Sequence, residues 1–90
     1  MNSKHKRYKV EVTPRFRKML RKLKPEAQHR TLKKLKELET KPRSFKRLHG
    51  PLAGRYAVRI GDYRVIYLVD EGKKVVYLVT VQHRRRIYGS

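Results

Sequence analysis

One stretch of the chain decides its fold: Gly54-Arg55-Tyr56-Ala57-Val58-Arg59-Ile60, then Gly61-Asp62, then Tyr63-Arg64-Val65-Ile66-Tyr67. Side chains alternate in character on both sides of the two-residue Gly61-Asp62 loop, which is the pattern of a tight β-hairpin. A glycine in the first loop position suits a type II′ turn. This hairpin pairs Ile60 with Tyr63, so we expect Arg59 to lie directly opposite Arg64 on one face of a sheet.

The facing arginines suggest a site for an anion. Two guanidinium groups opposite each other across neighbouring strands repel, and such a pair usually needs an anion or a function. A further strand follows the hairpin and leads into a basic tail that contains His83, Arg84 and Tyr88. We therefore expect one sheet face to bind phosphate through Arg59 and Arg64, close to His83, Arg84 and Tyr88.

Composition indicates a small domain with a negatively charged partner. The 90 residues suffice for one domain, which we assign to residues 1–90. Lys and Arg number 26 against 7 Asp and Glu, so the net charge is +19. Proteins of thermophiles gain acidic residues together with basic ones, which is not the case here. The excess of basic residues therefore favours a polyanionic partner. The absence of cysteine excludes disulfides, zinc-finger cores and thiol catalysis.

The chain shows no signal for secretion or for a membrane. Its basic amino terminus is not followed by an apolar segment, so we expect no signal peptide. No apolar run approaches the ~20 residues that a membrane span requires. The histidines lack the spacing of metal ligands, so we expect neither a metal site nor a cofactor. These features predict a cytoplasmic protein without membrane association.

The first forty residues predict one strand and two helices. Residues 8–12 alternate as a short strand, and Thr13-Pro14 is a helix start with an N-cap threonine. The apolar stripe of that first helix consists of Phe16, Met19, Leu20 and Leu23. Pro25 opens a second helix that ends at Thr40-Lys41-Pro42. Its expected buried face consists of Ala27, Thr31, Leu32, Leu35 and Leu38.

The rest of the chain predicts a loop and three strands. Residues 43–54 form the loop, anchored on the core by Phe45, Leu48 and Leu52. Strands follow at 55–60, 63–69 and 75–82, and the last two are apolar on both faces, which is typical of central strands. The order β-α-α-β-β-β predicts an α+β domain in which both helices pack on one face of a mostly antiparallel sheet.

The two sheet faces differ in character. We expect the helices to cover the more apolar side, formed by Tyr56, Val58, Ile60, Tyr63, Val65, Tyr67 and Val69. The other side carries Arg55, Ala57, Arg59, Arg64, Ile66 and Leu68. We expect this second side to be open and basic, with Ile66 and Leu68 exposed as part of an interaction surface.

Three motifs together resemble the RelE/ParE toxin superfamily over nearly the whole chain: Leu48-x-Gly50, the hairpin Arg55–Tyr67, and the ending His83-Arg84-Arg85-x-Ile87-Tyr88. The resemblance implies a RelE-like fold. RelE-like members are ribosome-dependent mRNA endonucleases, whereas ParE-like members poison DNA gyrase. Both kinds of toxin are neutralised by a cognate antitoxin, so the resemblance implies an acidic, RelB-like partner and a toxin–antitoxin hetero-oligomer.

The resemblance also implies a set of catalytic residues. In RelE-like enzymes the ribose 2′-hydroxyl attacks the adjacent phosphate of mRNA in the ribosomal A site, which requires a base, cations and an acid. Arg59, Arg64, Arg84 and Tyr88 match the family pattern, and His83 falls where members carry His or Lys. The imidazole of His83 suits either proton-transfer role, and beside the arginines we expect it to act as the base. The chain departs from the pattern at Ala57, which is basic in some members, and in a shorter step from Arg84 to Tyr88.

Other basic residues are expected to contact ribosomal RNA through its phosphate backbone. They are Arg30, Lys33, Lys34, Lys41, Arg43, Lys46, Arg47, Arg55, Arg85 and Arg86. Two alternatives stay open: a gyrase-poisoning toxin without nuclease chemistry, and a basic RNA-binding or ribosome-binding protein. The sequence favours the endoribonuclease, because a gyrase inhibitor does not need the five predicted catalytic residues in one cluster.

Overall fold

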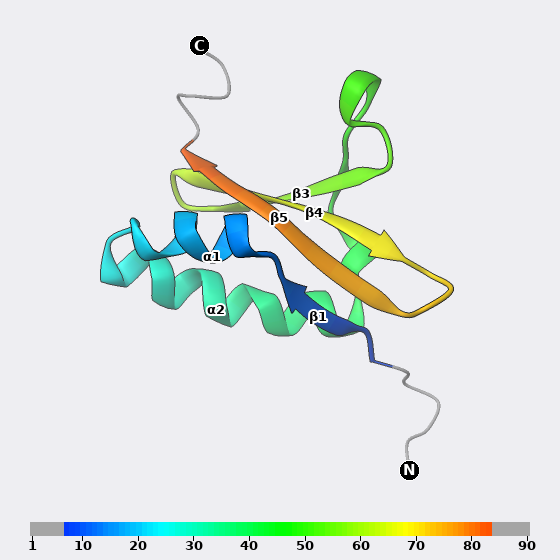
Figure 1. Cartoon of the computed structure of the whole chain (residues 1–90), viewed down its shortest axis with the longest axis horizontal. Helices are drawn as coiled ribbons and strands as arrows, with labels where there is room; N and C mark the ends of the chain where they lie inside the picture. Colours follow the sequence, from blue (N-terminus) through cyan, green and yellow to red (C-terminus); the bar gives the residue numbers. More distant parts are fainter. Residues whose placement is uncertain (1–6, 84–90) are drawn as a thin grey trace.

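Two helices lie across one face of a five-stranded sheet in the computed structural model, which describes residues 7–83 (Figure 1). The sheet order is β1-β5-β4-β3-β2, with β1 parallel to β5 and every other neighbouring pair antiparallel. The predicted α+β class, with both helices on one face of a mostly antiparallel sheet, is confirmed. The elements are β1 (Lys9–Val12), α1 (Pro14–Arg21), α2 (Pro25–Thr40), η1 (Pro42–Ser44), β2 (Lys46–Arg47), η2 (Gly50–Leu52), β3 (Arg55–Ile60), β4 (Tyr63–Asp70) and β5 (Val75–His83).

Both helices begin where the sequence predicts. The hydroxyl of Thr13 accepts a hydrogen bond from the Phe16 backbone N–H at 3.2 Å, as an N-cap residue does. The same Oγ1 donates to the carbonyl of Leu78 at 2.7 Å, which joins the start of α1 to β5. Pro25 occupies the first turn of α2. None of the helices in the described residues is long and apolar enough to cross a membrane.

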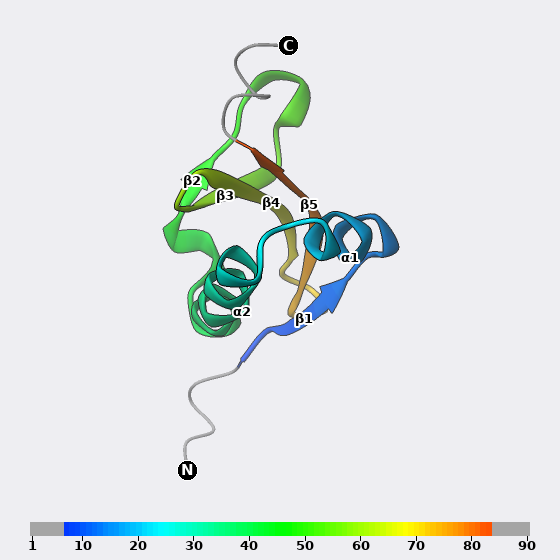
Figure 2. The same ribbon diagram turned by 90° about the vertical axis from the view of Figure 1, so that its left-hand side faces the viewer.

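The core lies between the helices and the predicted apolar side of the sheet (Figure 2). Phe16 of α1 and Leu38 of α2 are fully buried against it. The strands contribute Tyr56, Val58, Ile60, Val65, Tyr67, Val76, Leu78 and Val81. Tyr63 and Val69 are half-buried and pack on this cluster. The assignment of the helix-covered side, called here the helix face, is therefore confirmed.

Two predicted core residues are exposed instead. Leu32 is 53% exposed, because successive helical residues turn by about 100° and carry it away from the line through Thr31 and Leu38. Leu52 is 42% exposed, at the end of η2 in a segment that projects from the sheet (Figure 1). The loop that was expected at 43–54 also contains β2, a two-residue strand that the sequence analysis missed.

The side of the sheet away from the helices, called here the basic face, is less open than the sequence suggests. Ile66 is only 7% exposed, and its cross-strand neighbours Ala57 and Thr80 are buried as well. The expectation of an exposed Ile66 is wrong, because a side chain in the middle of a central strand is flanked by neighbours on both adjoining strands. Leu68 is half-buried.

A polar cluster ties the chain together where β4 turns into β5. The Tyr8 hydroxyl donates to the Glu71 carboxylate at 2.8 Å, and Arg43 and Lys74 approach the same carboxylate at 3.3 and 3.5 Å. The bond from Tyr8, assisted by Lys74 and Arg43, holds the pKa of Glu71 below its ordinary value of 4.5. The cluster therefore connects the start of the chain, the segment before β2 and the β4–β5 turn through one carboxylate.

Replacing Glu71 by Gln should lower the melting temperature at neutral pH. A carboxyl whose pKa is depressed on folding stabilises the fold above its ordinary pKa and loses that effect as the pH falls through the folded-state value. The difference between wild type and Glu71→Gln should therefore shrink between pH 5 and pH 3, measured by thermal denaturation. Glu26→Gln, which removes an exposed carboxylate from α2, is the control. An equal difference at both pH values would contradict this prediction.

Candidate nucleic-acid interface

The hairpin places two arginines opposite each other, as predicted. Ile60 pairs with Tyr63, and Arg59 therefore pairs with Arg64. Gly61 has a φ of 61°, whereas Asp62 in the second loop position has no positive φ, as a type II′ turn requires. Arg59 is exposed and Arg64 is half-buried. The tight turn thus holds the two like charges side by side at one end of the basic face.

Positive charge gathers on the basic face. The strand register places Arg55 and Arg59 of β3, Arg64 of β4 and Lys46 of β2 on the same side of the sheet. Within the described chain, the strand carboxylates on this side belong to Glu11 of β1 and to Asp70, the last residue of β4. Glu11 forms an ion pair with Lys9 at 3.2 Å, and Asp70 accepts from the Lys73 backbone at 3.0 Å. Both strand carboxylates are thus engaged elsewhere, and although Asp62 lies in the hairpin loop, the four basic side chains give this face an excess of positive charge that suits an anion.

Guanidinium pairs are well matched to phosphate. Each guanidinium presents several N–H donors in a planar fork that fits two oxygens of one phosphate. A phosphate between Arg59 and Arg64 would replace their mutual repulsion by two charge-assisted contacts. Because both side chains start from paired strands, the site needs little ordering of the backbone before it binds.

His83 does not join the arginines on the basic face. It pairs with Tyr63 at the end of β5, and the two rings meet edge to face with centroids 5.2 Å apart. Its neighbour Gln82 pairs with Arg64, so the alternation of the strand directs His83 to the helix face. His83 therefore neighbours Arg64 in the register but starts from the other side of the sheet, and its catalytic role stays a prediction.

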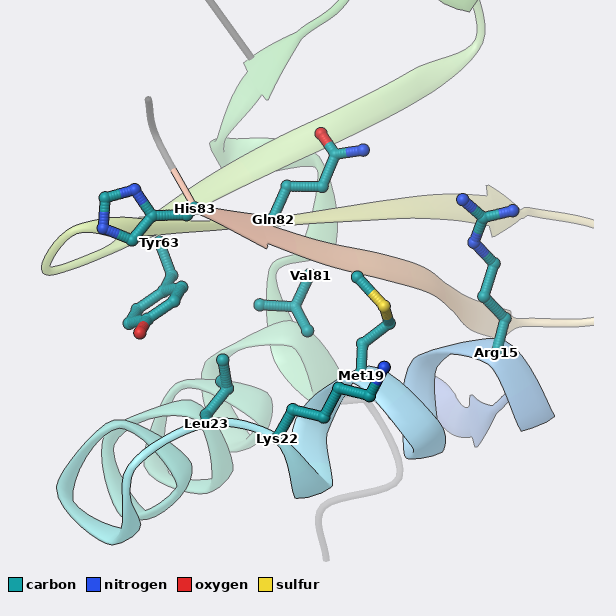
Figure 3. A pocket seen from close by; sticks show the side chains of 8 residues that line it. All are labelled: Arg15, Met19, Lys22, Leu23, Tyr63, Val81, Gln82 and His83. Atoms are coloured by element: carbon teal, nitrogen blue, oxygen red, sulfur yellow. The ribbon is translucent and has the colours of Figure 1, made fainter. Parts of the chain in front are cut away.

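His83 instead borders a hollow between α1 and the end of β5 (Figure 3). The hollow has a volume of about 670 Å³, and Tyr63 and Val81 point into it from the sheet side. Its other lining residues are Arg15, Met19, Lys22, Leu23, Gln82 and His83. The described residues contain no group of His, Asp and Glu side chains that could hold a metal ion.

The other predicted RNA-binding residues fall into two groups. Arg43 donates to the Tyr56 hydroxyl at 3.3 Å and reaches Glu71, and the bond with Tyr56 raises its pKa. Arg30 and Lys34 form ion pairs with Glu26 and Glu37 on their own helix. The remaining predicted RNA-binding residues in the described part of the chain are exposed or half-buried: Lys33, Lys41, Lys46, Arg47 and Arg55. The predicted residues Arg84, Arg85, Arg86 and Tyr88 lie outside the described residues.

Gln82 is the residue of this surface that the sequence analysis missed. It extends the pair of arginines into a row across three strands, Arg59–Arg64–Gln82. The sequence signal was the alternation within Val81-Gln82-His83, where a polar side chain precedes the histidine. Reading it correctly required the register of β5 against β4, which joins residues far apart in the chain.

Comparison with known proteins identifies the class to which this fold belongs. The sequence model of the family described as the ParE toxin of type II toxin–antitoxin systems matches residues 10–88. The chain is also 32% identical over 85 residues to a Methanocaldococcus jannaschii protein designated as toxin RelE4, covering 90% of both chains. The chain belongs to the ParE toxin family, within the RelE/ParE superfamily, and is a toxin of the type II toxin–antitoxin class.

Solved structures agree with this assignment. The structure of the toxin–antitoxin complex RelBE2 from Mycobacterium tuberculosis contains a similar chain with a TM-score of 0.80 and 32% identity. That match covers 87% of this chain and 99% of the other. The archaeal RelE–RelB complex from Pyrococcus horikoshii matches with a TM-score of 0.74 and 32% identity, covering 88% and 97%. The resemblance to RelE toxins is therefore confirmed at the level of fold and sequence.

Replacing Arg59 by Gln should raise the melting temperature at low salt. The substitution removes half of a repulsive cross-strand pair, while the helix-face core is untouched. Arg47→Gln is the matched control, since it removes the same charge from a strand position opposite Tyr56. The excess stabilisation of Arg59→Gln over the control should fade near 1 M salt, where the Debye length is about 3 Å. Equal shifts for both variants at low salt would contradict a repulsive pair.

Proposed function

We propose that this toxin is a ribosome-dependent endoribonuclease that cleaves mRNA in the ribosomal A site. One observation supports the proposal above others: Arg59 and Arg64 are held opposite each other on the basic face. Two guanidiniums in this arrangement repel each other, and a phosphate bound between them would attract both. The identity with proteins named RelE, at about one third of positions, favours this branch of the superfamily.

The proposed reaction is attack of a ribose 2′-hydroxyl on the adjacent phosphate. The 2′-oxygen loses its proton and bonds to phosphorus, and the bond to the 5′-oxygen breaks. The 5′-oxygen takes up a proton, and the other fragment ends in a cyclic 2′,3′-phosphate. Negative charge develops on the phosphate oxygens in between, and Arg59 and Arg64 would stabilise it there from preorganised positions. Loss of one such donor typically costs ~10²–10³ in rate.

Dependence on the ribosome follows from the side chains that this face offers. Beside the two arginines, the described residues of the row and its neighbour supply an amide and a hydroxyl, Gln82 and Thr80, but no imidazole or carboxylate. A site without a strong base in place gains most from having its substrate oriented by another body, and the ribosome can do this. His83, Arg84 and Tyr88 stay predicted participants in proton transfer, His83 from the helix face.

The remaining exposed bases would hold the toxin on ribosomal RNA. Contacts between cationic side chains and phosphates position a protein without reading sequence. Lys33 of α2 and Lys46 of β2 lie on different sides of the domain and are both exposed. We therefore assign Lys33, Lys41, Lys46 and Arg47 to binding rather than to chemistry, together with Arg30, Lys34, Arg43 and Arg55.

A gyrase-poisoning toxin is the second candidate. The description of the matching family, a ParE toxin, favours it directly. Such a toxin would act by binding a protein and would need no phosphate site on the sheet. The facing arginines at the hairpin end give the endoribonuclease the stronger support.

Induced expression should arrest translation and leave mRNAs cut within codons, with free RNA cut poorly. Purified toxin added to programmed ribosomes, followed by primer extension on the mRNA, measures the cleavage. Arg64→Ala should reduce the single-turnover rate by ~10²–10³. Lys33→Ala should weaken binding to ribosomes and reduce its salt dependence without changing the chemical step. Intact mRNA together with trapped gyrase–DNA complexes would favour the second candidate.

We also propose that an acidic, RelB-like antitoxin neutralises this toxin in a hetero-oligomer. The net charge of +19 makes the free domain self-repelling and attracts an acidic chain. The similar toxins from M. tuberculosis and P. horikoshii were both solved in toxin–antitoxin complexes. An acidic segment that is disordered alone and folds on binding would suit so basic a surface.

Purification of the toxin from its native operon should yield a complex with a small acidic chain. Native mass spectrometry gives the stoichiometry, and the complex should loosen as salt rises because opposite charges contribute to it. The toxin recovered from the complex should regain activity. A lone toxin chain in the native preparation, with no acidic partner, would contradict the proposal.

A further inference from the structure

We propose that Gln82 reads the nucleotide base beside the cleaved phosphate, and that the hydroxyl of Thr80 orients its amide. This inference rests on the proposed endoribonuclease function and assigns the base specificity of the same site. It follows from where β5 places these two side chains relative to the facing arginines.

Gln82 continues the row of arginines onto the third strand. Arg59 of β3 pairs with Arg64 of β4, and Arg64 pairs with Gln82 of β5. Neighbouring strands are about 4.8 Å apart, so directly paired side chains on one face are in reach of a common ligand. In Figure 3 the Gln82 amide points away from α1, whereas Val81 and Tyr63 point toward the helices. The amide therefore lies on the basic face beside Arg64.

An amide in this position is suited to a base rather than to the phosphate. A phosphate held between the two guanidiniums leaves the next group in the row beside the sugar and base attached to it. Glutamine carries both a donor and an acceptor, and adenine presents the matching pair at N6 and N7. Proteins read single-stranded RNA through such edges of unstacked bases. Gln82 would thus favour adenine next to the cleaved bond.

Thr80 supplies a second, independent observation. It precedes Gln82 by two residues on the same face and pairs with Ile66. Its side chain is only 6% exposed, and Oγ1 has no hydrogen-bond partner among the described residues. Buried polar groups in folded proteins are nearly always bonded, so an unbonded hydroxyl beside a candidate site points to a partner gained on binding. We assign that role to the Gln82 amide, because Gln82 follows Thr80 by two residues on the same face.

The test compares cleavage of ribosome-bound mRNAs that differ only in the bases of the A-site codon. Single-turnover rates with wild type should favour adenine at the cleaved bond. Gln82→Met keeps the length of the side chain and removes the amide, and should reduce this preference by roughly 5- to 150-fold. Gln28→Met is the control, because its amide lies on α2 and donates to the Leu23 carbonyl at 2.8 Å. That variant should keep the wild-type ratio of rates.

Thr80 variants separate a positioning residue from a structural one. Thr80→Val should reduce the adenine preference, as Gln82→Met does. Thr80→Ser, which keeps the hydroxyl, should retain the preference of the wild type. The melting temperature of Thr80→Val should equal or exceed that of wild type, because the substitution removes an unbonded buried hydroxyl. A lower preference with unimpaired stability cannot come from misfolding.

The outcomes distinguish this inference from the proposed function. A wild-type toxin that cuts no ribosome-bound mRNA overturns the endoribonuclease proposal and the reading of a base with it. A wild-type toxin that cuts at the same rate whatever the base overturns only the proposed recognition of a base by Gln82. A Gln82→Met toxin with the wild-type ratio of rates does the same.

Discussion

The register of the β3–β4 hairpin is the constraint on which the rest of this domain depends. Its two-residue loop pairs Ile60 with Tyr63, and side chains of paired strands then alternate between the two faces. A slip by one residue would exchange the faces, placing arginines under the helices and tyrosines in solvent. Full burial of a large apolar side chain contributes about 1.5–3 kcal/mol, whereas a cross-strand pair contributes roughly 0.2–1 kcal/mol. The core therefore holds Arg59 against Arg64 despite their repulsion.

The sheet separates stability from function. The helix face carries the buried tyrosines of the core and packs against Phe16 and Leu38 of the helices, so substitutions there act on folding. The basic face carries the arginine row, which adds little to stability in the free protein. A toxin built in this way can change the residues of its basic face without rebuilding its core. The same separation makes the arginines of this face informative, because packing does not explain them.

The opposite end of the domain is organised around one acid. Glu71 collects Tyr8, Lys74 and Arg43, and Arg43 also donates to the Tyr56 hydroxyl. With 7 acids against 26 bases, each carboxylate that is engaged in the fold is unavailable to balance the basic face. The uneven placement of the few acids, as much as the number of bases, leaves the basic face with an excess of positive charge.

Local patterns in the sequence determined the start of α1 at Thr13-Pro14, the start of α2 at Pro25 and the hairpin that opposes Arg59 and Arg64. Caps, prolines and tight turns act over a few residues, so they can be read without knowing the rest of the fold. Only the tertiary structure decided the parallel pairing of β1 with β5, the short strand β2, and the exposure of Leu32.

The candidate site also depends partly on a local sequence pattern and partly on the tertiary structure. Its arginine pair came from a local turn, whereas the third strand of the row came from the pairing of β5 with β4, which joins Gln82 to Arg64. That register sends His83 to the helix face and brings Gln82 beside Arg64, which the sequence motifs did not indicate. Because side chains alternate with a period of two, a site that spans strands depends on long-range pairing. The sequence alone does not contain that pairing in any local pattern.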